Sequence, residues 1–367
     1  MKLNPDDYFY RQRRISRHRA IASARKSNKA TKNKIGSLES TPTPRYINAP
    51  AMIGLHTREM HLELTKFLSA LRKECTKNPS VRINFGKTVK VFSVGTLLML
   101  AEIERIYLTL KGKCKLTCTY PTDDTVEKVF QQIGLFQIIG KEHRLKITDE
   151  DTSVIHWRYA SGVSVNPKDA DILLKAIRGK IPQGYLRLVT GVSEAMDNAV
   201  HHAYIRPRGD RLSGMEHADD RRWWVFAQVL DGRLSVIFCD LGLGIPVTLP
   251  ERWAEQIGDI LRLTSLSPGK RDMRMIRRAL ELGRTRTDQN HRGKGLARNI
   301  LKAAQELNGR LYVYSNMGVV GVDFKGGAPS YTQGAFDKSI LGTVIQWSVP
   351  ITDTQDLEHE NDENDNF

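Results

Sequence analysis

The sequence lacks any apolar run of about 20 residues, the length that a helix needs to cross a bilayer. The longest candidate, residues 91–103, is shorter and contains Glu102. No apolar segment follows the charged N-terminus, so we expect neither a signal peptide nor a membrane anchor. Cysteine is scarce too, and the pair Cys114 and Cys118 has no second Cys/His pair nearby. These absences argue against a zinc site and predict reduced cysteines in a cytoplasmic protein.

Charge is unevenly spread along a chain whose net charge is +15. Residues 1–37 carry eleven Lys/Arg against two Asp, whereas residues 353–367 carry seven Asp/Glu and no Lys/Arg. We expect residues 1–46 to be a disordered basic arm with a linker, and residues 353–367 to be a disordered acidic tail. The stretch 11–34 can hold the phosphates of nucleic acid or an acidic protein surface, or it can serve only to solubilise the chain.

Residues 47–150 have the pattern of a small α/β unit. Apolar residues recur at helical spacing in 61–73, and they alternate with polar residues in 81–85. We expect a second helix up to Leu110, with Ser93 as its N-cap, and a second strand over 115–120. A short helix is predicted over 125–133, with Gly134 just past its end.

This order of strands and helices resembles a STAS domain, the fold of anti-sigma-factor antagonists. The matching stretches are Ile83-Asn84-Phe85, then Phe92-Ser93-Val94-Gly95, and later residues 129–135. Ser93 falls near the position where antagonists of this family carry a phosphorylated Ser or Thr. Phe92 stands where the family usually has an acidic residue, so we expect Ser93 to cap the helix rather than to be phosphorylated.

Residues 151–352 are predicted to form a second domain with helices and a mostly antiparallel sheet. A hairpin is marked by Asp231-Gly232 between two apolar strands, 223–230 and 234–239. This content predicts an α+β fold, a two-layer α/β sandwich. The other predicted elements are strands over 154–159, 310–315, 319–324 and 343–349, and helices over 168–178, 185–203 and 294–307.

Glu194 and Asn198 are four residues apart on the predicted helix 185–203 and therefore neighbours on one face. The Asn198 carbonyl oxygen suits Mg²⁺, a hard ion that prefers oxygen ligands. The Glu194 carboxylate can take a proton from water or from a substrate hydroxyl. The same two residues would also fit an ordinary solvated polar face.

Asp240 ends an apolar strand and is followed by Gly242 and Gly244. A carboxylate there can accept a hydrogen bond from an adenine amino group, and the glycines let the backbone approach the base closely. An ordinary Asp-Gly turn is the alternative, since a lone Gly-x-Gly is weak evidence.

A third segment places glycines at the start of the predicted helix 294–307. Free backbone N–H groups at such a position favour phosphate, and Lys294 can add positive charge or point to solvent. Between the second and third segments, residues 246–292 are rich in Lys and Arg and are predicted to form a lid over the site. One or more of these cations can reach a terminal phosphate, and the rest can bind a partner or face solvent.

Taken in order, the segments resemble the nucleotide site of GHKL ATPases, the fold shared by DNA gyrase, MutL-type repair proteins, sensor histidine kinases and anti-sigma-factor serine kinases. Glu194 and Asn198 match the family's N box, residues 240–244 its first glycine box and residues 293–296 its second. Thr343, after Gly342, matches a strand residue that helps to hold adenine.

The resemblance implies a Bergerat-type fold that binds ATP and Mg²⁺. It makes Glu194 the general base, Asn198 the Mg²⁺ ligand, and Asp240 and Thr343 the adenine contacts. The other nucleotide contacts that it implies are Gly242, Gly244, Gly293, Lys294, Gly295 and Leu296.

Residues 194–204 are most similar to the anti-sigma-factor serine kinases, although the expected lid is longer than theirs. The stretch after Thr343 is too short for the second domain of a gyrase- or MutL-type clamp. We therefore expect a regulatory protein in which ATP hydrolysis or Ser/Thr phosphotransfer drives lid closure and partner switching. Two alternatives remain: a non-catalytic ATP-gated interaction module whose arm docks nucleic acid or protein, and a histidine-kinase-like signalling protein. A protein partner is expected, and a homodimer is left open.

Overall fold

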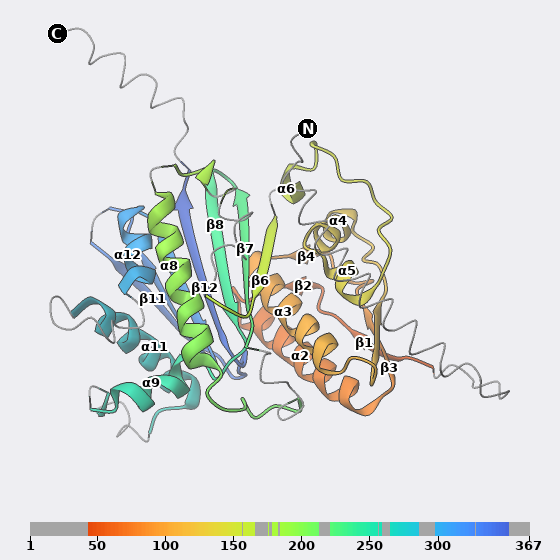
Figure 1. Ribbon diagram of the computed structural model, residues 1–367, viewed down its shortest axis with the longest axis horizontal. Helices are drawn as coiled ribbons and strands as arrows, with labels where there is room; N and C mark the ends of the chain where they lie inside the picture. Colours follow the sequence, from red (N-terminus) through yellow and green to blue (C-terminus); the bar gives the residue numbers. More distant parts are fainter. Residues whose placement is uncertain are drawn as a thin grey trace, which may run out of the picture. The chain divides into compact units, whose positions relative to one another are not determined.

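A computed structural model (Figure 1) describes residues 43–155, 157–165, 175, 178–182, 184–212, 221–255, 257–258, 265–285, 298–326 and 328–351. From Pro44 on, the described residues belong to one compact unit. No helix within these ranges is long and apolar enough to cross a membrane. The basic stretch 11–34 and the acidic tail 353–367 lie outside the described residues.

The N-terminal part of the unit contains a parallel three-stranded sheet in the order β1-β3-β5. Helices connect successive strands, as parallel strands require. A further pair, β2 and β4, is also parallel. The elements are β1 (Arg45–Asn48), β2 (Met52–Ile53), α2 (Arg58–Lys77), β3 (Ser80–Asn84), β4 (Lys90–Val91), α3 (Ser93–Thr109), β5 (Lys115–Cys118), α4 (Asp124–Gln132), α5 (Leu135–Ile139) and α6 (Thr152–Ile155).

Local signals explain where several of these helices begin and end. Asp123 caps α4 by accepting a hydrogen bond from the backbone N–H of Val126 at 2.9 Å. Gly134 ends α4 in the left-handed region at φ 81°, as its position in the sequence predicted. The prediction for Ser93 was wrong: Phe92 is the N-cap of α3, without a side-chain hydrogen bond, and Ser93 is already the first helical residue.

The C-terminal part forms a seven-stranded sheet in the order β11-β10-β9-β12-β8-β7-β6, antiparallel between all neighbours. Its strands are β6 (Arg158–Gly162), β7 (Trp223–Leu230), β8 (Arg233–Asp240), β9 (Arg310–Ser315), β10 (Gly318–Asp323), β11 (Ser330–Ala335) and β12 (Thr343–Pro350). Its helices are α8 (Tyr185–Asn198), the π-helical turn η2 (Ala199–Ala203), α9 (Ile245–Trp253), α11 (Pro268–Thr285) and α12 (Arg298–Glu306).

The mixed helix and strand content confirms the expected α+β class, and most of the predicted strands are present. Asp231 and Gly232 both have positive φ, as a two-residue hairpin turn between β7 and β8 requires. The strand predicted over 154–159 was wrong, because α6 occupies its first residues and β6 starts only at Arg158. The helix predicted over 168–178 lies mostly outside the described residues.

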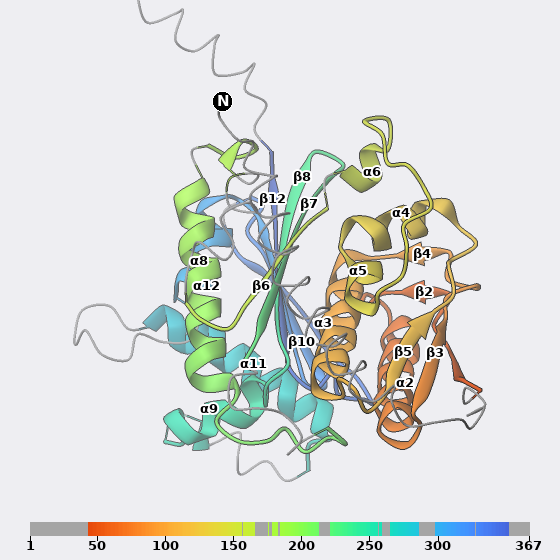
Figure 2. The ribbon, with the colours of Figure 1, turned by 45° about the vertical axis from the view of Figure 1, so that its right-hand side comes forward.

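Helices cover both faces of the seven-stranded sheet (Figure 2). On one face, α8 and α12 pack on inward side chains such as Val225, Phe238 and Trp347. On the other face, Trp224 and Phe226 share a hydrophobic core with residues of α3 and α2. The two sides alternate along each strand, as the pleat requires. The two-layer prediction for 151–352 did not include this third layer, which comes from α3.

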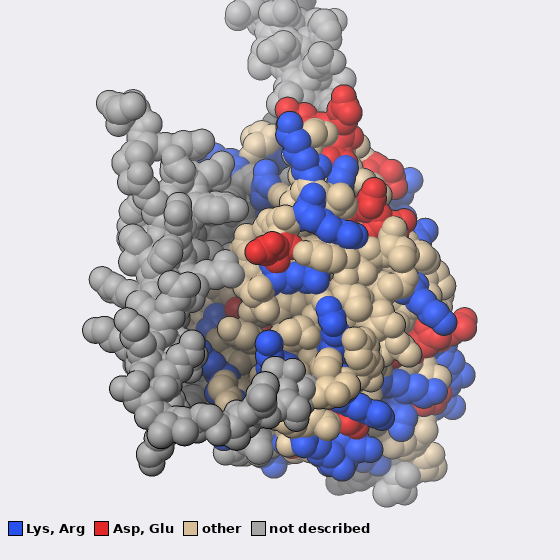
Figure 3. Space-filling view, turned by 90° about the vertical axis from the view of Figure 1, so that its right-hand side faces the viewer, with Lys and Arg blue, Asp and Glu red and all other residues tan. Residues whose placement is uncertain are grey.

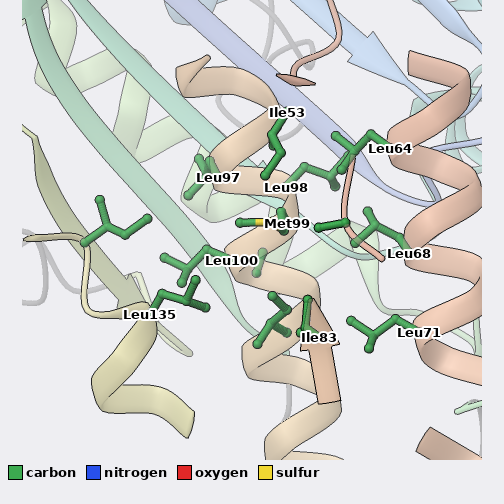
Figure 4. Packing of buried hydrophobic residues seen from close by; sticks show 14 of the residues in the cluster. Ile53, Leu64, Leu68, Leu71, Ile83, Leu97, Leu98, Met99, Leu100 and Leu135 are labelled. Carbon is green, nitrogen blue, oxygen red and sulfur yellow. The ribbon is translucent and has the colours of Figure 1, made fainter. Parts of the chain in front are cut away.

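Helix α3 is buried because it packs between two layers. Figure 4 shows Leu97, Leu98 and Leu100 of α3 together with side chains of α2 and β3. A helix that is apolar nearly all round is typical of such a position. Glu104 of this helix has partners across the interface: its carboxylate accepts hydrogen bonds from Tyr159 Oη at 2.6 Å and Trp224 Nε1 at 2.7 Å.

Candidate functional site

A pocket opens between the end of α8, the ends of β8 and β12, and helices α9 and α11. It contains about 570 Å³ of space not filled by atoms, part of it open to solvent. Most of its wall is apolar, with a few polar groups, as is typical of small-molecule sites. It is lined by Ala195, Asn198, His202, Ala203, Phe238, Asp240, Gly244, Ile245, Thr248, Ile276, Ala279, Leu280, Ile300, Val313, Thr343 and Ile345.

Four of the residues proposed from the sequence meet in this pocket although they come from separate parts of the chain. Asn198 ends α8, Asp240 ends β8, Gly244 precedes α9, and Thr343 begins β12. Asp240 and Thr343 are direct partners in the antiparallel register of β8 and β12. The topology thus brings a carboxylate, a hydroxyl and an amide to one concave surface.

Glu194 lies one helical turn before Asn198 but does not line the pocket. Its Oε2 accepts a hydrogen bond of 2.9 Å from the backbone N–H of Asn299, in the first turn of α12. Burial raises the pKa of the Glu194 carboxyl to about 7, although hydrogen bonds from Asn299 and from the Arg298 backbone oppose the shift. A carboxyl with a pKa near neutrality is well suited to proton transfer.

Asp240 is buried at the end of β8, with 6 % of its surface exposed. Its Oδ1 accepts a hydrogen bond from the Gly242 N–H at 3.0 Å. Burial raises the pKa of the Asp240 carboxyl to about 7, while hydrogen bonds from Gly242 and Thr343 and the nearby Arg208 work in the opposite direction. The Asp240 carboxylate is therefore held by the loop that follows it, and Asp240 also lines the pocket.

The loop after Asp240 is held by a hydrogen bond at each of its first three amides. The Leu241 N–H donates to Tyr204 Oη at 3.0 Å, Gly242 to the Asp240 carboxylate, and Leu243 to the Ala203 carbonyl at 2.8 Å. Two of these acceptors, Ala203 and Tyr204, lie at the end of the π-helical turn η2 that follows α8. Such turns are frequent at functional sites.

Gly242 has no room for a side chain, because a Cβ there would lie 2.3 Å from the Ala203 carbonyl oxygen. We expect Gly242→Ala to displace the loop from η2 and to lower the free energy of unfolding by about 1–3 kcal/mol. Chemical denaturation measures this effect. Gly258→Ala is the matched control, since a Cβ at Gly258 meets no atom within 4 Å. Equal stabilities of the two variants would contradict the described packing of the loop.

Polar residues that the sequence analysis did not identify hold the loops and strand ends beside the pocket. Ser315 Oγ lies 3.1 Å from Thr343 Oγ1 and accepts a hydrogen bond of 2.9 Å from the Ile245 N–H. Asn316 Nδ2 donates to the Leu243 carbonyl at 2.9 Å. Ser315 could have been found from its place at the end of a strand beside β12, but only once the strand order was known.

Helix α11 forms one wall of the pocket through Ile276, Ala279 and Leu280. It belongs to the segment 246–292, which the sequence predicts to be a lid over the nucleotide site. Of its cations, Arg277 pairs with Glu281 at 2.9 Å and lies 3.9 Å from the centre of the Tyr331 ring. In the described conformation this arginine is therefore engaged with its own helix and with β11.

The expected phosphate-binding segment lies outside the described residues; it comprises Gly293, Lys294, Gly295 and Leu296. The first described residues after it, Arg298 and Asn299, begin α12 beside Glu194. Among the described residues no group of three or more His, Cys, Asp or Glu side chains is arranged to hold a metal ion. Asn198 lines the pocket, and an amide oxygen is a suitable ligand for a hard cation.

The stability of the ligand-free protein is expected to fall as the pH rises through the range set by Asp240 and Glu194. Both carboxyls have a pKa raised to about 7, so the folded state retains protons that the unfolded state has released. Asp240→Asn removes one of these charges. At pH 8 it should be more stable than the wild type by on the order of 2–4 kcal/mol, with a smaller gain at about pH 5.

Urea unfolding of both proteins across this range measures the effect. A variant whose stability follows the same pH dependence as the wild type would contradict the burial of an ionisable Asp240.

Comparison with known proteins gives no match to any protein-family model, and a search of curated proteins gives none either.

Proposed function

We propose that this protein binds Mg·ATP in the pocket between α8, β8, β12 and α11, and that it is a regulatory ATPase or protein kinase of the GHKL type. The observation that carries the proposal is the convergence of Asn198, Asp240, Gly244 and Thr343 on one pocket. These residues are spread over 146 positions of the chain, from 198 to 343, and the sequence motifs alone predict that they share a site.

Adenine suits the apolar wall and the two polar groups at its end. The flat base would lie among Phe238, Ile276 and Ile345, while its amino group donates to Asp240 and Thr343 supports the same edge. A buried carboxylate that accepts a hydrogen bond from a base amino group discriminates against analogues that lack this group. Mg²⁺, when bound, would neutralise the phosphates, and Asn198 would offer it one oxygen while phosphates and water supply the others.

Glu194 would act as the base that takes a proton from the attacking water or hydroxyl. Its pKa of about 7 suits that task. In the described conformation its carboxylate is bound to the Asn299 N–H, next to the segment expected to hold phosphate. Nucleotide binding in that segment would change this contact and free the carboxylate.

Incubation with γ-labelled ATP and Mg²⁺ tests the proposal and separates its two branches. Free labelled phosphate indicates hydrolysis, and label retained on protein indicates phosphotransfer. A protein that binds ATP but yields neither product would be a nucleotide-gated module, and one that does not bind ATP would overturn the proposal.

A second candidate function is a non-catalytic, ATP-gated interaction module. The engagement of Glu194 by the Asn299 N–H, away from the lining of the pocket, favours it.

In this function the basic stretch 11–34 docks nucleic acid or protein. Figure 3 shows Lys and Arg interspersed with Asp and Glu on one face, so the described surface there is mixed in sign. Deletion of residues 1–37 should weaken salt-dependent nucleic-acid binding, and unchanged binding would exclude this role of the arm.

A further inference from the structure

Five charged side chains form a buried network between the N-terminal helices and the loops of the candidate site. Glu102 of α3 is fully buried, Arg208 and Asp210 have 4 % of their side chains exposed, and Arg72 and Arg105 have 8 %. Burying charges is costly unless every partner is satisfied. A network of this kind therefore constrains the geometry of whatever it contacts.

Arg208 is the centre of the network, and all three nitrogens of its guanidinium donate hydrogen bonds. Nη2 donates to both oxygens of Glu102 at 2.8 and 2.7 Å, and Nε donates to Asp210 at 2.7 Å. Nη1 donates to two backbone carbonyls, those of Leu241 at 3.3 Å and Leu341 at 2.5 Å. The guanidinium thus joins one carboxylate of α3 to two separate loops.

The two carbonyls belong to the loops that present the proposed adenine contacts. Leu241 directly follows Asp240, and Leu341 is two residues before Thr343. The backbone between Leu341 and Thr343 is tightly confined: Leu341 has φ 55°, and a Cβ on Gly342 would lie 2.3 Å from the Asp240 carbonyl oxygen. Small displacements of either loop would therefore move Asp240 relative to Thr343.

The partners of Arg208 keep its geometry fixed. Arg105 Nη1 donates to Asp210 at 2.7 Å and to Glu102 at 3.2 Å, and Arg72 lies 3.3 Å from Glu102. Burial opposes ionisation of Glu102, but Arg208, Arg72 and Arg105 outweigh it and lower its pKa to about 2. Glu102 is therefore a permanent anion at neutral pH, and it holds Arg208 at the loops.

We propose that Glu102 and Arg208 are positioning residues of the nucleotide site, so that α3 of the N-terminal part contributes to ATP binding. Arg208 sets the separation of the loops at Asp240 and Thr343, and Glu102 sets the position of Arg208. The inference rests on the proposed nucleotide function, but the order of the loops can be measured without nucleotide.

The test compares Glu102→Gln with Glu127→Gln. Glu127 is also a fully buried carboxylate of the N-terminal part, paired through both oxygens with Arg144 at 2.7 and 2.6 Å, and these bonds involve neither loop. In the ligand-free protein, hydrogen exchange at the amides of Leu241 and Leu243 should be about tenfold or more faster in Glu102→Gln than in Glu127→Gln. Equal exchange in the two variants would overturn the proposal.

A second readout concerns the nucleotide. Glu102→Gln should raise KM for ATP by about tenfold while kcat stays within about twofold, because the loops hold the base and not the reacting phosphate. A variant that is only less stable would lose active protein and lower the apparent kcat at unchanged KM. That result would overturn the positioning role.

Arg208→Lys supplies a variant that retains the positive charge but cannot reach both carbonyls and both carboxylates. It should show the same faster exchange and the same rise in KM, and it carries the test if Glu102→Gln does not fold. A Lys variant with wild-type exchange and KM would overturn the proposal. If wild-type protein does not bind ATP, the proposed nucleotide function fails, and the exchange measurement alone still decides whether Glu102 and Arg208 position the loops.

Discussion

Replacing Glu194 with Gln is expected to leave ATP binding nearly unchanged and to lower turnover by about 10²–10⁴-fold. Gln keeps an oxygen that can accept the Asn299 N–H hydrogen bond, so the contact between α8 and α12 survives. What it loses is the basic carboxylate, whose pKa of about 7 makes it a proton acceptor at neutral pH. Measurements of ATP affinity and of product formation on the same preparation separate these two effects.

Asp197→Asn is the matched control for Glu194→Gln. Asp197 lies on the same helix, with just over half of its side chain exposed, and its carboxylate lies 3.4 Å from His201 Nε2 one turn away. It should keep both binding and turnover. Retained hydrolysis in Glu194→Gln would remove Glu194 as the base and would favour the non-catalytic function.

Asp240→Asn is expected to weaken ATP binding by about 10–100-fold, which corresponds to the loss of a hydrogen bond to a charged acceptor. The substitution keeps the size of the side chain and an oxygen for the Gly242 N–H, so the loop should stay in place. The new amide group, however, presents donors to the adenine amino group. Isothermal titration with Mg·ATP measures the change.

Asp272→Asn is the control for Asp240→Asn, because Asp272 also accepts a backbone hydrogen bond, from Met317 at 3.0 Å, and does not line the pocket. It should bind ATP as the wild type does. Unchanged affinity in Asp240→Asn would show that the base is not held where the pocket suggests. The gain in ligand-free stability expected for this variant at pH 8 depends on the burial of Asp240 and not on ATP, so that result would leave it unchanged.

Local patterns predicted much of the fold. The apolar runs of β7 and β8, together with Asp231-Gly232, predicted the hairpin and so the position of Asp240 at a strand end. The spacing of Glu194 and Asn198 predicted their place on α8. These features could be found because they depend on residues a few positions apart, where helix and strand periods act directly.

Features that depend on tertiary packing could not be predicted in the same way. Strand β11 has a mostly polar, exposed pattern and gave no apolar signal. The apolar residues of α3 predicted a helix up to Leu110, but not that it would cover the far face of the C-terminal sheet. Arg208 lies in an irregular segment and has no motif, and its role depends on Glu102, which is 106 residues away.

In the proposed site, the Asp240 carboxylate would recognise the adenine amino group. This recognition is tested most directly by titrating wild-type protein with Mg·ATP and with the magnesium complex of inosine triphosphate, which carries an oxygen where adenine has its amino group. We expect ATP to bind about 10–100-fold more tightly, because the inosine oxygen would face the Asp240 carboxylate without a proton to share. Equal affinity for the two nucleotides, or no binding of ATP, would contradict it.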